Sequence, residues 1–189
     1  MIEDAGAPTS PGRRRLLKRG LLGGALLLVG GALPLALRST LVRTRPRGPL
    51  HLLSEQEHAI FAAVAARLAP GDGAGPRWPT AEALDCAGKV DALMAKVHPE
   101  VGAELRQLLR LFESALFGLA FTGTPTPFTR LAPAAQDARL EAWRHARLAL
   151  LRSGYQAMKR LAHAAYYSSP EVYALVGYPG PPDVPRGPA

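Results

Sequence analysis

Cysteine is almost absent from this chain, in which Cys86 is the only one. A single cysteine excludes an intramolecular disulfide, a Cys-x-x-Cys-His haem attachment site and a zinc site built from several thiolates. Cys86 shares a predicted helix face with Val90, Leu93 and Val97, so we expect it to be a small buried hydrophobic residue. The alternative is a disulfide to another chain, because an odd cysteine outside the cytoplasm can pair between chains.

Complete catalytic motifs are missing as well. No Gly-x-Ser-x-Gly nucleophile motif occurs, and the glycine-rich stretch 71–75 follows a predicted helix, unlike a phosphate-binding loop. Glu55-x-x-His58 has the spacing of half a di-iron site, but the chain has no second Glu-x-x-His. We therefore predict a surface histidine at His58, and we expect no catalytic residue, no metal and no bound cofactor.

Strand patterns are also absent, so we predict an all-α fold, a compact bundle of about five helices. Ser54 and Glu57 match a capping box that opens the first helix. The third helix has a broad apolar stripe, which favours a central position covered on more than one side. Ser169 is expected to cap a short last helix that Gly177 ends. The apolar periodicity predicts the longer helices at about 55–68, 81–97, 99–121, 133–146 and 148–165.

Only one long apolar run occurs, and it lies near the N-terminus. Residues 20–37 contain no charge, and they follow the sequence Arg13-Arg14-Arg15-Leu16-Leu17-Lys18. A basic cluster before an apolar run is typical of an export signal. The pattern resembles a twin-arginine signal, in which Arg13, Arg14, Leu16, Leu17 and Lys18 would recruit the twin-arginine translocase. The alternative is a plain membrane anchor, since 18 residues are just enough to cross a bilayer, and cleavage stays open.

The net charge of +8 is concentrated at the N-terminus. Residues 1–50 hold nine Lys and Arg against two Asp and Glu, which leaves 14 against 13 in residues 51–189. The remainder of the chain is therefore nearly neutral, at +1. A neutral domain lacks the basic surface that nucleic acid requires, so we expect no nucleic-acid partner.

These features divide the chain into five parts. The domain, at 125 residues, is long enough to form one hydrophobic core. The parts are a disordered n-region at 1–12, a twin-arginine signal or anchor at 13–38, a linker at 39–52, a helical domain at 53–177 and a Pro-rich tail at 178–189.

Aromatic residues are scarce, yet several gather in loops and near the C-terminus. Tyr and Trp are enriched at protein interfaces, so we predict a partner interface, although these side chains could instead close the end of the bundle. Adjacent residues on a helix point about 100° apart, so one of two neighbouring tyrosines should face the core and the other a partner. The predicted interface residues are Trp78, Tyr166, Tyr167, Tyr173 and Tyr178.

Several short segments carry a resemblance to a known family. They are the stretches 166–173 (YYSSPEVY), 177–182 (GYPGPP), 53–57 (LSEQE), 68–70 (LAP) and 83–85 (ALD). In these segments the chain resembles the small subunit of membrane-bound gluconate 2-dehydrogenase and of related sugar dehydrogenases. The resemblance covers about residues 52–182, and none of its motifs is a catalytic signature.

The resemblance implies a non-catalytic subunit. It implies that the chain binds an FAD-containing large subunit of the glucose–methanol–choline (GMC) oxidoreductase type, beside a cytochrome c subunit. The small subunit would assist the folding and the twin-arginine export of its partner. We therefore expect a periplasmic protein, anchored through residues 20–37 if the signal is kept. The alternative is a stand-alone, membrane-anchored helical domain with a binding or structural role.

Overall fold

The structure is a computed structural model, and it describes residues 40–70, 75 and 77–182. The predictions for the n-region at 1–12, for the signal or anchor at 13–38 and for the glycines at 71 and 73 lie outside the described residues, as does the end of the tail at 183–189. The described part has no strand, so the all-α prediction is confirmed. Its helices are α3 (Glu55–Leu68), α4 (Cys86–Met94), α5 (Pro99–Glu113), α6 (Ala115–Thr122), η3 (Phe128–Arg130), α7 (Pro133–Arg144), α8 (Ala149–Tyr167), α9 (Pro170–Tyr173) and η4 (Ala174–Val176).

The described residues thus form seven α-helices, where about five were predicted. One reason is a break at Ser114, which has non-helical backbone angles of φ −57° and ψ 123°. Its hydroxyl accepts a hydrogen bond from the amide of Phe117, so Ser114 is the N-cap of a new helix. Serine favours this position because its side chain satisfies one of the free amides in the first turn. The predicted third helix is therefore two helices, α5 and α6.

The start of α3 confirms the predicted capping box. The amide of Glu57 donates to the hydroxyl of Ser54 at 3.2 Å, and the amide of Ser54 donates to the carboxylate of Glu57 at 2.9 Å. The predicted second helix, at about 81–97, is in contrast longer than the observed helix α4. Residues 81–85 form turns, and Asp85 has a left-handed backbone (φ 51°) whose carboxylate accepts from the amide of Gly88. The helix therefore begins at Cys86 and ends at Met94, and Leu93 and Val97 are largely exposed.

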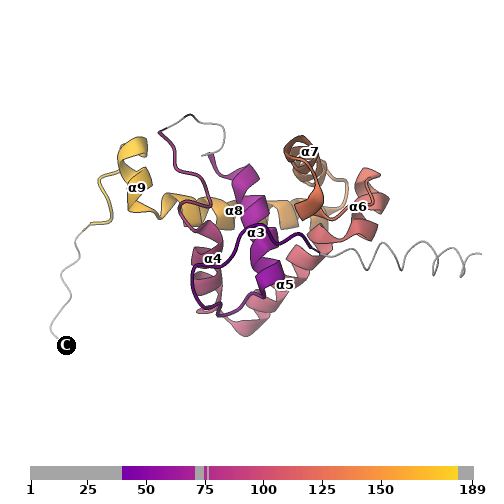
Figure 1. The fold of residues 1–189 in the computed structure, drawn as a ribbon, viewed down its shortest axis with the longest axis horizontal. Helices are drawn as coiled ribbons and strands as arrows, with labels where there is room; N and C mark the ends of the chain where they lie inside the picture. The colour runs from indigo at the N-terminus through magenta and orange to yellow at the C-terminus, as the bar shows by residue number, and fades with distance from the viewer. Residues whose placement is uncertain (1–39, 71–74, 76, 183–189) are drawn as a thin grey trace, which may run out of the picture. The chain divides into compact units, whose positions relative to one another are not determined.

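Helices α3 and α8 form the centre of the domain. Helix α3 packs against α4, α5, α7 and α8, and α8 also packs against α4, α7 and α9 (Figure 1). The prediction that the third helix is central is therefore wrong. Only part of its broad apolar stripe is buried. Leu105 and Leu109 face the core, whereas Val101 is 46% exposed at the surface.

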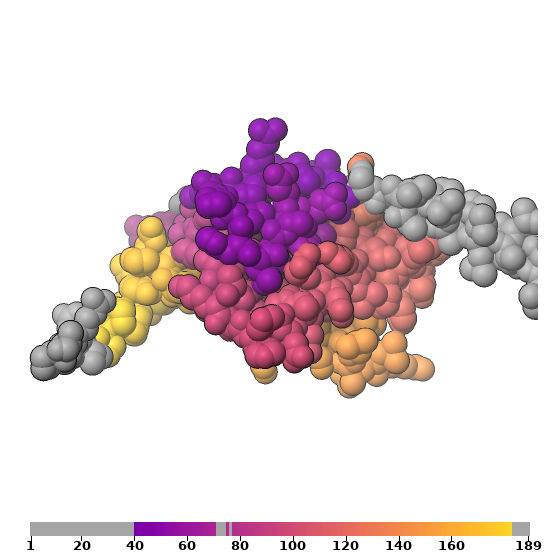
Figure 2. All heavy atoms as spheres, turned by 90° about the horizontal axis from the view of Figure 1, so that it is seen from below, coloured from indigo at the N-terminus to yellow at the C-terminus, as the bar shows by residue number. Residues whose placement is uncertain are grey.

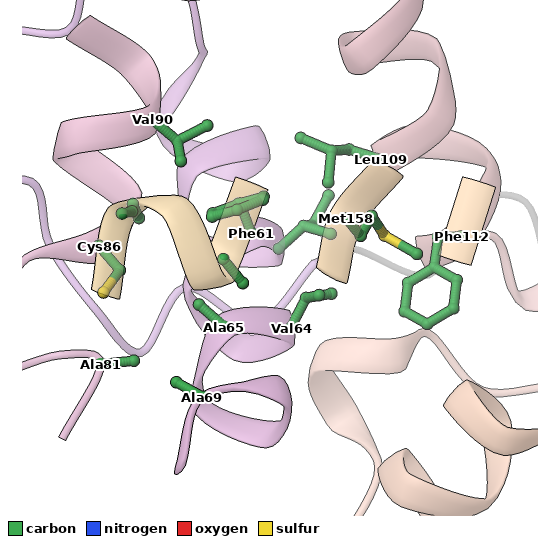
Figure 3. Packing of buried hydrophobic residues seen from close by; sticks show 14 of the residues in the cluster. Phe61, Val64, Ala65, Ala69, Ala81, Cys86, Val90, Leu109, Phe112 and Met158 are labelled. Atoms are coloured by element: carbon green, nitrogen blue, oxygen red, sulfur yellow. The ribbon is translucent and has the colours of Figure 1, made fainter. Parts of the chain in front are cut away.

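The centre of the hydrophobic core joins side chains from α3, α4 and α8. Figure 3 shows Phe61 and Val64 of α3, Val90 of α4 and Met158 of α8 directed toward one another, and all four are fully buried. Cys86 is also buried, as predicted. Burial disfavours its thiolate and raises the pKa of the thiol to about 11. The thiol therefore stays protonated at neutral pH and is a poor nucleophile.

The segment that precedes α3 is fixed to the surface of the domain. The carboxylate of Asp91 on α4 accepts hydrogen bonds from the amides of His51, Leu52 and Leu53 at 2.7 to 2.9 Å. The Arg47 guanidinium donates to the carbonyl of Glu82 at 2.7 Å. Figure 2 shows this indigo segment at the surface, beside later parts of the chain in magenta and salmon. Residues 40–53 are therefore held in place by the domain, although they contain no helix.

Candidate partner interface

The two adjacent tyrosines that end α8 have opposite environments. Tyr166 is fully buried, and its hydroxyl donates to the carbonyl of Pro79 at 2.8 Å. Tyr167 is 40% exposed, and its ring meets that of Tyr166 edge-on with the centroids 5.4 Å apart. Of these two side chains, Tyr166 is therefore in the core and Tyr167 is accessible to a partner.

The other two tyrosines form a pair beyond α8. Gly177 has a left-handed backbone (φ 69°), which glycine adopts without steric cost, and it turns the chain back after η4. The amide of Tyr178 then donates to the carbonyl of Tyr173 at 2.9 Å, and the two rings lie edge-on at 5.1 Å. Tyr173 is half-buried and donates its hydroxyl to the carbonyl of Ser168, whereas Tyr178 is 45% exposed.

Trp78 lies beside this end of α8. Its side chain is partly buried against the hydrophobic core. The next residue, Pro79, accepts the hydrogen bond from Tyr166, so the loop of Trp78 and the end of α8 are adjacent. The structure therefore brings Trp78, Tyr166 and Tyr167 together. Tyr173 follows at the end of α9, and Tyr178 follows η4.

The corner between α8 and α9 is fastened to α4. The Lys89 ammonium donates to the hydroxyl of Ser169, and this hydroxyl donates to the carbonyl of Ala165 at 3.3 Å. Ser169 is the N-cap residue of α9, as predicted, but its side chain makes no capping hydrogen bond. It links three helices instead, which holds Tyr173 in a defined position.

An apolar groove between α5 and α8 was not expected from the sequence. It has a volume of about 800 Å³, and Leu150 at its edge is 70% exposed. The broad apolar stripe on the predicted third helix is the sequence signal of this groove, but such a stripe equally fits a helix that is buried on more than one side. The residues that line the groove include Val101, Leu105, Leu108, Leu111, Leu150 and Leu161.

Buried charged residues in the domain are engaged in structural contacts. Burial opposes ionisation of Glu57, but hydrogen bonds from Ser54 and Arg106 outweigh it and lower the pKa of this carboxyl. Burial also opposes ionisation of Asp91, and its three backbone amides again lower the pKa. Burial prevails at Glu113 and raises its pKa, although Thr129 donates two hydrogen bonds to this carboxyl. Each carboxyl therefore joins elements together.

The prediction of a surface histidine at His58 is wrong. The side chain is 1% exposed, and neither ring nitrogen has a hydrogen-bond partner among the described residues. Burial lowers the pKa of His58, although Asp85 and Asp91 raise it in part. Glu55 is exposed, and within the described ranges no group of three or more potential metal ligands occurs.

The fold and these surfaces define a class of protein: a small all-helical domain with exposed aromatic and apolar surfaces, which is typical of a subunit or binding module. The comparison with protein families is more specific. The chain belongs to the gluconate 2-dehydrogenase subunit 3 family, whose model matches residues 55–180, and membership suggests an accessory subunit of a gluconate dehydrogenase complex. No significant match to a curated protein or to a solved structure was found.

None of the helices described between residues 40 and 182 is both long enough and apolar enough to cross a bilayer. The predicted anchor at residues 20–37 lies outside this part of the chain.

Proposed function

We propose that this chain is the non-catalytic accessory subunit of an exported, flavin-dependent dehydrogenase complex. Its partner is a large subunit of the GMC oxidoreductase type, which holds FAD and carries out the oxidation of a sugar or alcohol. The observation that carries this proposal is the family match, which begins at the first residue of α3 and extends past η4. The match therefore involves the entire helical domain.

The accessory subunit assists the folding and export of its partner. Arg13, Arg14, Leu16, Leu17 and Lys18 form the twin-arginine signal that recruits the translocase for the assembled pair. The mature complex then lies in the periplasm, held at the membrane through residues 20–37, and a cytochrome c subunit accepts the electrons. The basic cluster and the uncharged run that follows it support this proposal.

The partner binds at the C-terminal aromatic surface, which we define as Trp78, Tyr167, Tyr173 and Tyr178. These side chains are exposed or half-buried, and they lie on a corner that Lys89 and Ser169 fasten to α4. Aromatic residues that are held rigidly lose little conformational entropy on binding, so they are suited to be interface anchors.

The test is a pull-down of the tagged full chain from an envelope extract. The eluate is analysed by mass spectrometry and by its absorption spectrum. We expect one large subunit with GMC-type sequence, together with the absorption of bound flavin. Recovery of the chain alone, from cells that contain the large subunit, would contradict the proposal and favour a stand-alone helical domain.

A further inference from the structure

The apolar groove between α5 and α8 has a closed floor and an open rim. Gly154 in the floor lies so close to Leu108 that an added Cβ would come within 2.7 Å of the leucine Cδ1 atom. At the rim, Val101 is 46% exposed and Leu150 is 70% exposed. Exposed apolar surface with polar residues at its edge is typical of an interaction site. An occupant of this groove lies along the surface and covers the exposed apolar side chains.

The length of the groove matches about three turns of a helix. The residues that line it extend from Val101 to Leu111 on α5 and from Leu150 to Leu161 on α8. At a rise of about 1.5 Å per residue, these walls are about 15 and 17 Å long. A pocket for a small molecule encloses most of its ligand, whereas here both walls carry exposed residues. An open apolar groove between two helices is the usual receptor of an amphipathic helix.

The exposed side of α8 continues from the groove to the C-terminal aromatic surface. One stripe of residues on this side is spaced alternately three and four positions apart, and each of its members is exposed or half-buried. This spacing is the seam along which a second helix packs in a coiled coil. The stripe ends at Tyr167, so a partner in the groove is continuous with a partner at the aromatic surface. Its residues are Leu150, Ser153, Ala157, Arg160, Ala164 and Tyr167.

The two walls of the groove carry charges of opposite sign. Glu104 on α5 and Arg160 on α8 both line the groove and are exposed. In the part of the chain that the structure describes, neither forms an ion pair, whereas Arg106 and Arg110 on α5 pair with Glu57. A complementary occupant has a basic group beside Glu104 and an acidic group beside Arg160. An acyl chain with an anionic headgroup lacks the basic group, but a helix with both types of side chain provides it.

The shape of the groove argues against a second copy of this chain as the occupant. A two-fold dimer places the same surface of both copies against each other. Two concave grooves that faced each other would leave the apolar floors around Leu108 unfilled. A convex element from a different subunit is therefore needed.

We propose that an amphipathic helix of the large, flavin-binding subunit lies in the groove between α5 and α8. Its apolar face covers Leu108 and Leu150, and its flanking charges pair with Glu104 and Arg160. This inference rests on the proposed function, because it takes the large subunit as the partner. Membership of a family of dehydrogenase subunits supports a protein partner of this kind. The groove and the C-terminal aromatic surface are then two contacts with the same subunit, joined by α8.

The test is photo-crosslinking of the tagged full chain. The photoreactive residue p-benzoylphenylalanine replaces Gln107 on the α5 wall or Leu150 on the α8 wall, which are both exposed. In the matched control it replaces Ala138, which is exposed on α7 and outside the groove lining. Envelopes from cells that contain the large subunit are illuminated. The products are purified through the tag and analysed by mass spectrometry.

We expect positions 107 and 150 to crosslink to the large subunit, at residues three, four or seven apart in one segment, and position 138 to give no such product. Crosslinks to a second copy of the chain or to lipid would overturn the proposal, and so would crosslinks to residues without helical spacing. Recovery of the large subunit with no crosslink from either groove position would also overturn it, while leaving the proposed function intact. Absence of the large subunit from every eluate would refute both.

A charge reversal tests the proposed orientation of the helix. Glu104→Lys with Arg160→Glu keeps the net charge but places like charges together, so recovery of the large subunit should fall by about tenfold or more. The matched control, Glu141→Lys with Arg144→Glu, reverses an exposed pair on α7 and should leave recovery unchanged. Circular dichroism verifies that both variants are folded. Unchanged recovery in the first variant, or an equal loss in both, would overturn the proposal.

Discussion

His58 is a buried imidazole in the first turns of α3. Both of its ring nitrogens lack a hydrogen-bond partner in the described part of the chain, and an unpartnered polar group in the core reduces stability. Asp85 and Asp91 raise the pKa of His58, but burial has the larger effect and lowers it below the usual 6.5. The folded protein therefore keeps this side chain neutral.

The depressed pKa of His58 makes the stability of the domain sensitive to acid. The unfolded chain takes up a proton near pH 6.5, and the folded chain does so only at lower pH, so the free energy of unfolding falls as the pH falls below about 6.5. The slope is at most about 1.4 kcal/mol per pH unit for one group. Urea denaturation between pH 7 and pH 5 measures it, and His58→Phe should make it shallower.

The matched control for this measurement is His145→Gln. His145 is exposed at the surface, so this variant loses a histidine without changing the core. A His58→Phe variant with the slope of the parent chain would show that another group causes the acid sensitivity.

At the scale of elements, the segment at residues 40–53 depends on one carboxylate. Asp91→Asn removes the charge that accepts three amide hydrogen bonds. Hydrogen bonds to charged groups contribute about 1.5–3 kcal/mol, so we expect a loss of about 2 kcal/mol in the free energy of unfolding. Trypsin should also cleave after Arg43 and Arg47 more rapidly. Asp137→Asn, which affects a half-exposed pair with Arg67, is the control and should change neither property.

The start of a helix was predictable from the sequence where the residues that fix it are close together in the chain. The capping box of Ser54 and Glu57 is contained in four residues, and the proline at the start of α7 marks that helix equally well. The left-handed Asp85 and the break at Ser114 were missed, because apolar periodicity continues through both positions. A hydrophobic pattern does not reveal a break in the backbone when the apolar residues keep their spacing on both sides of the break.

Contacts between distant segments were not predictable. Asp91 binds amides almost forty positions earlier, and Arg139 holds the loop after α6. His58 was placed at the surface because helix starts are usually exposed, but it faces α4 and the charges of Asp85 and Asp91. Of the predicted interface residues, Tyr166 and Tyr167 point in different directions, as helix geometry predicts for adjacent residues. The hydrogen bond from Tyr166 to Pro79 depends on tertiary structure.

At the scale of the whole molecule, export should depend on the arginines near the N-terminus. We expect the triple variant Arg13→Lys, Arg14→Lys and Arg15→Lys to remain in the cytoplasm, because the twin-arginine translocase distinguishes arginine from lysine. Fractionation and immunoblotting measure the distribution. The control replaces Arg38, Arg43 and Arg45 by Lys, which keeps the number and type of substitutions but leaves the signal intact. Normal export of the first variant would refute the twin-arginine signal.

Recovery of the flavoprotein should depend on the C-terminal aromatic surface. Tyr173→Ala with Tyr178→Ala removes two rings that contact each other, and Tyr178 is 45% exposed. A tyrosine that is an interface hot spot contributes on the order of 2 kcal/mol, so recovery of the large subunit in the pull-down should fall by at least about tenfold. The helical circular dichroism should change little, because α9 and η4 follow the central helices and contribute few residues.

The control for this variant is Leu93→Ala with Val97→Ala. It removes two similarly exposed apolar side chains, 47% and 39%, one in the last turn of α4 and one just after it. These changes should leave flavoprotein recovery unaltered. Loss of the helical signal in the double tyrosine variant would assign Tyr173 and Tyr178 to the core, as closure of the end of the bundle. Unchanged helicity with unchanged recovery would exclude these residues as the interface. The loop of Trp78 would then be the next surface to test, because Pro79 holds it against the buried Tyr166 on the same end of α8.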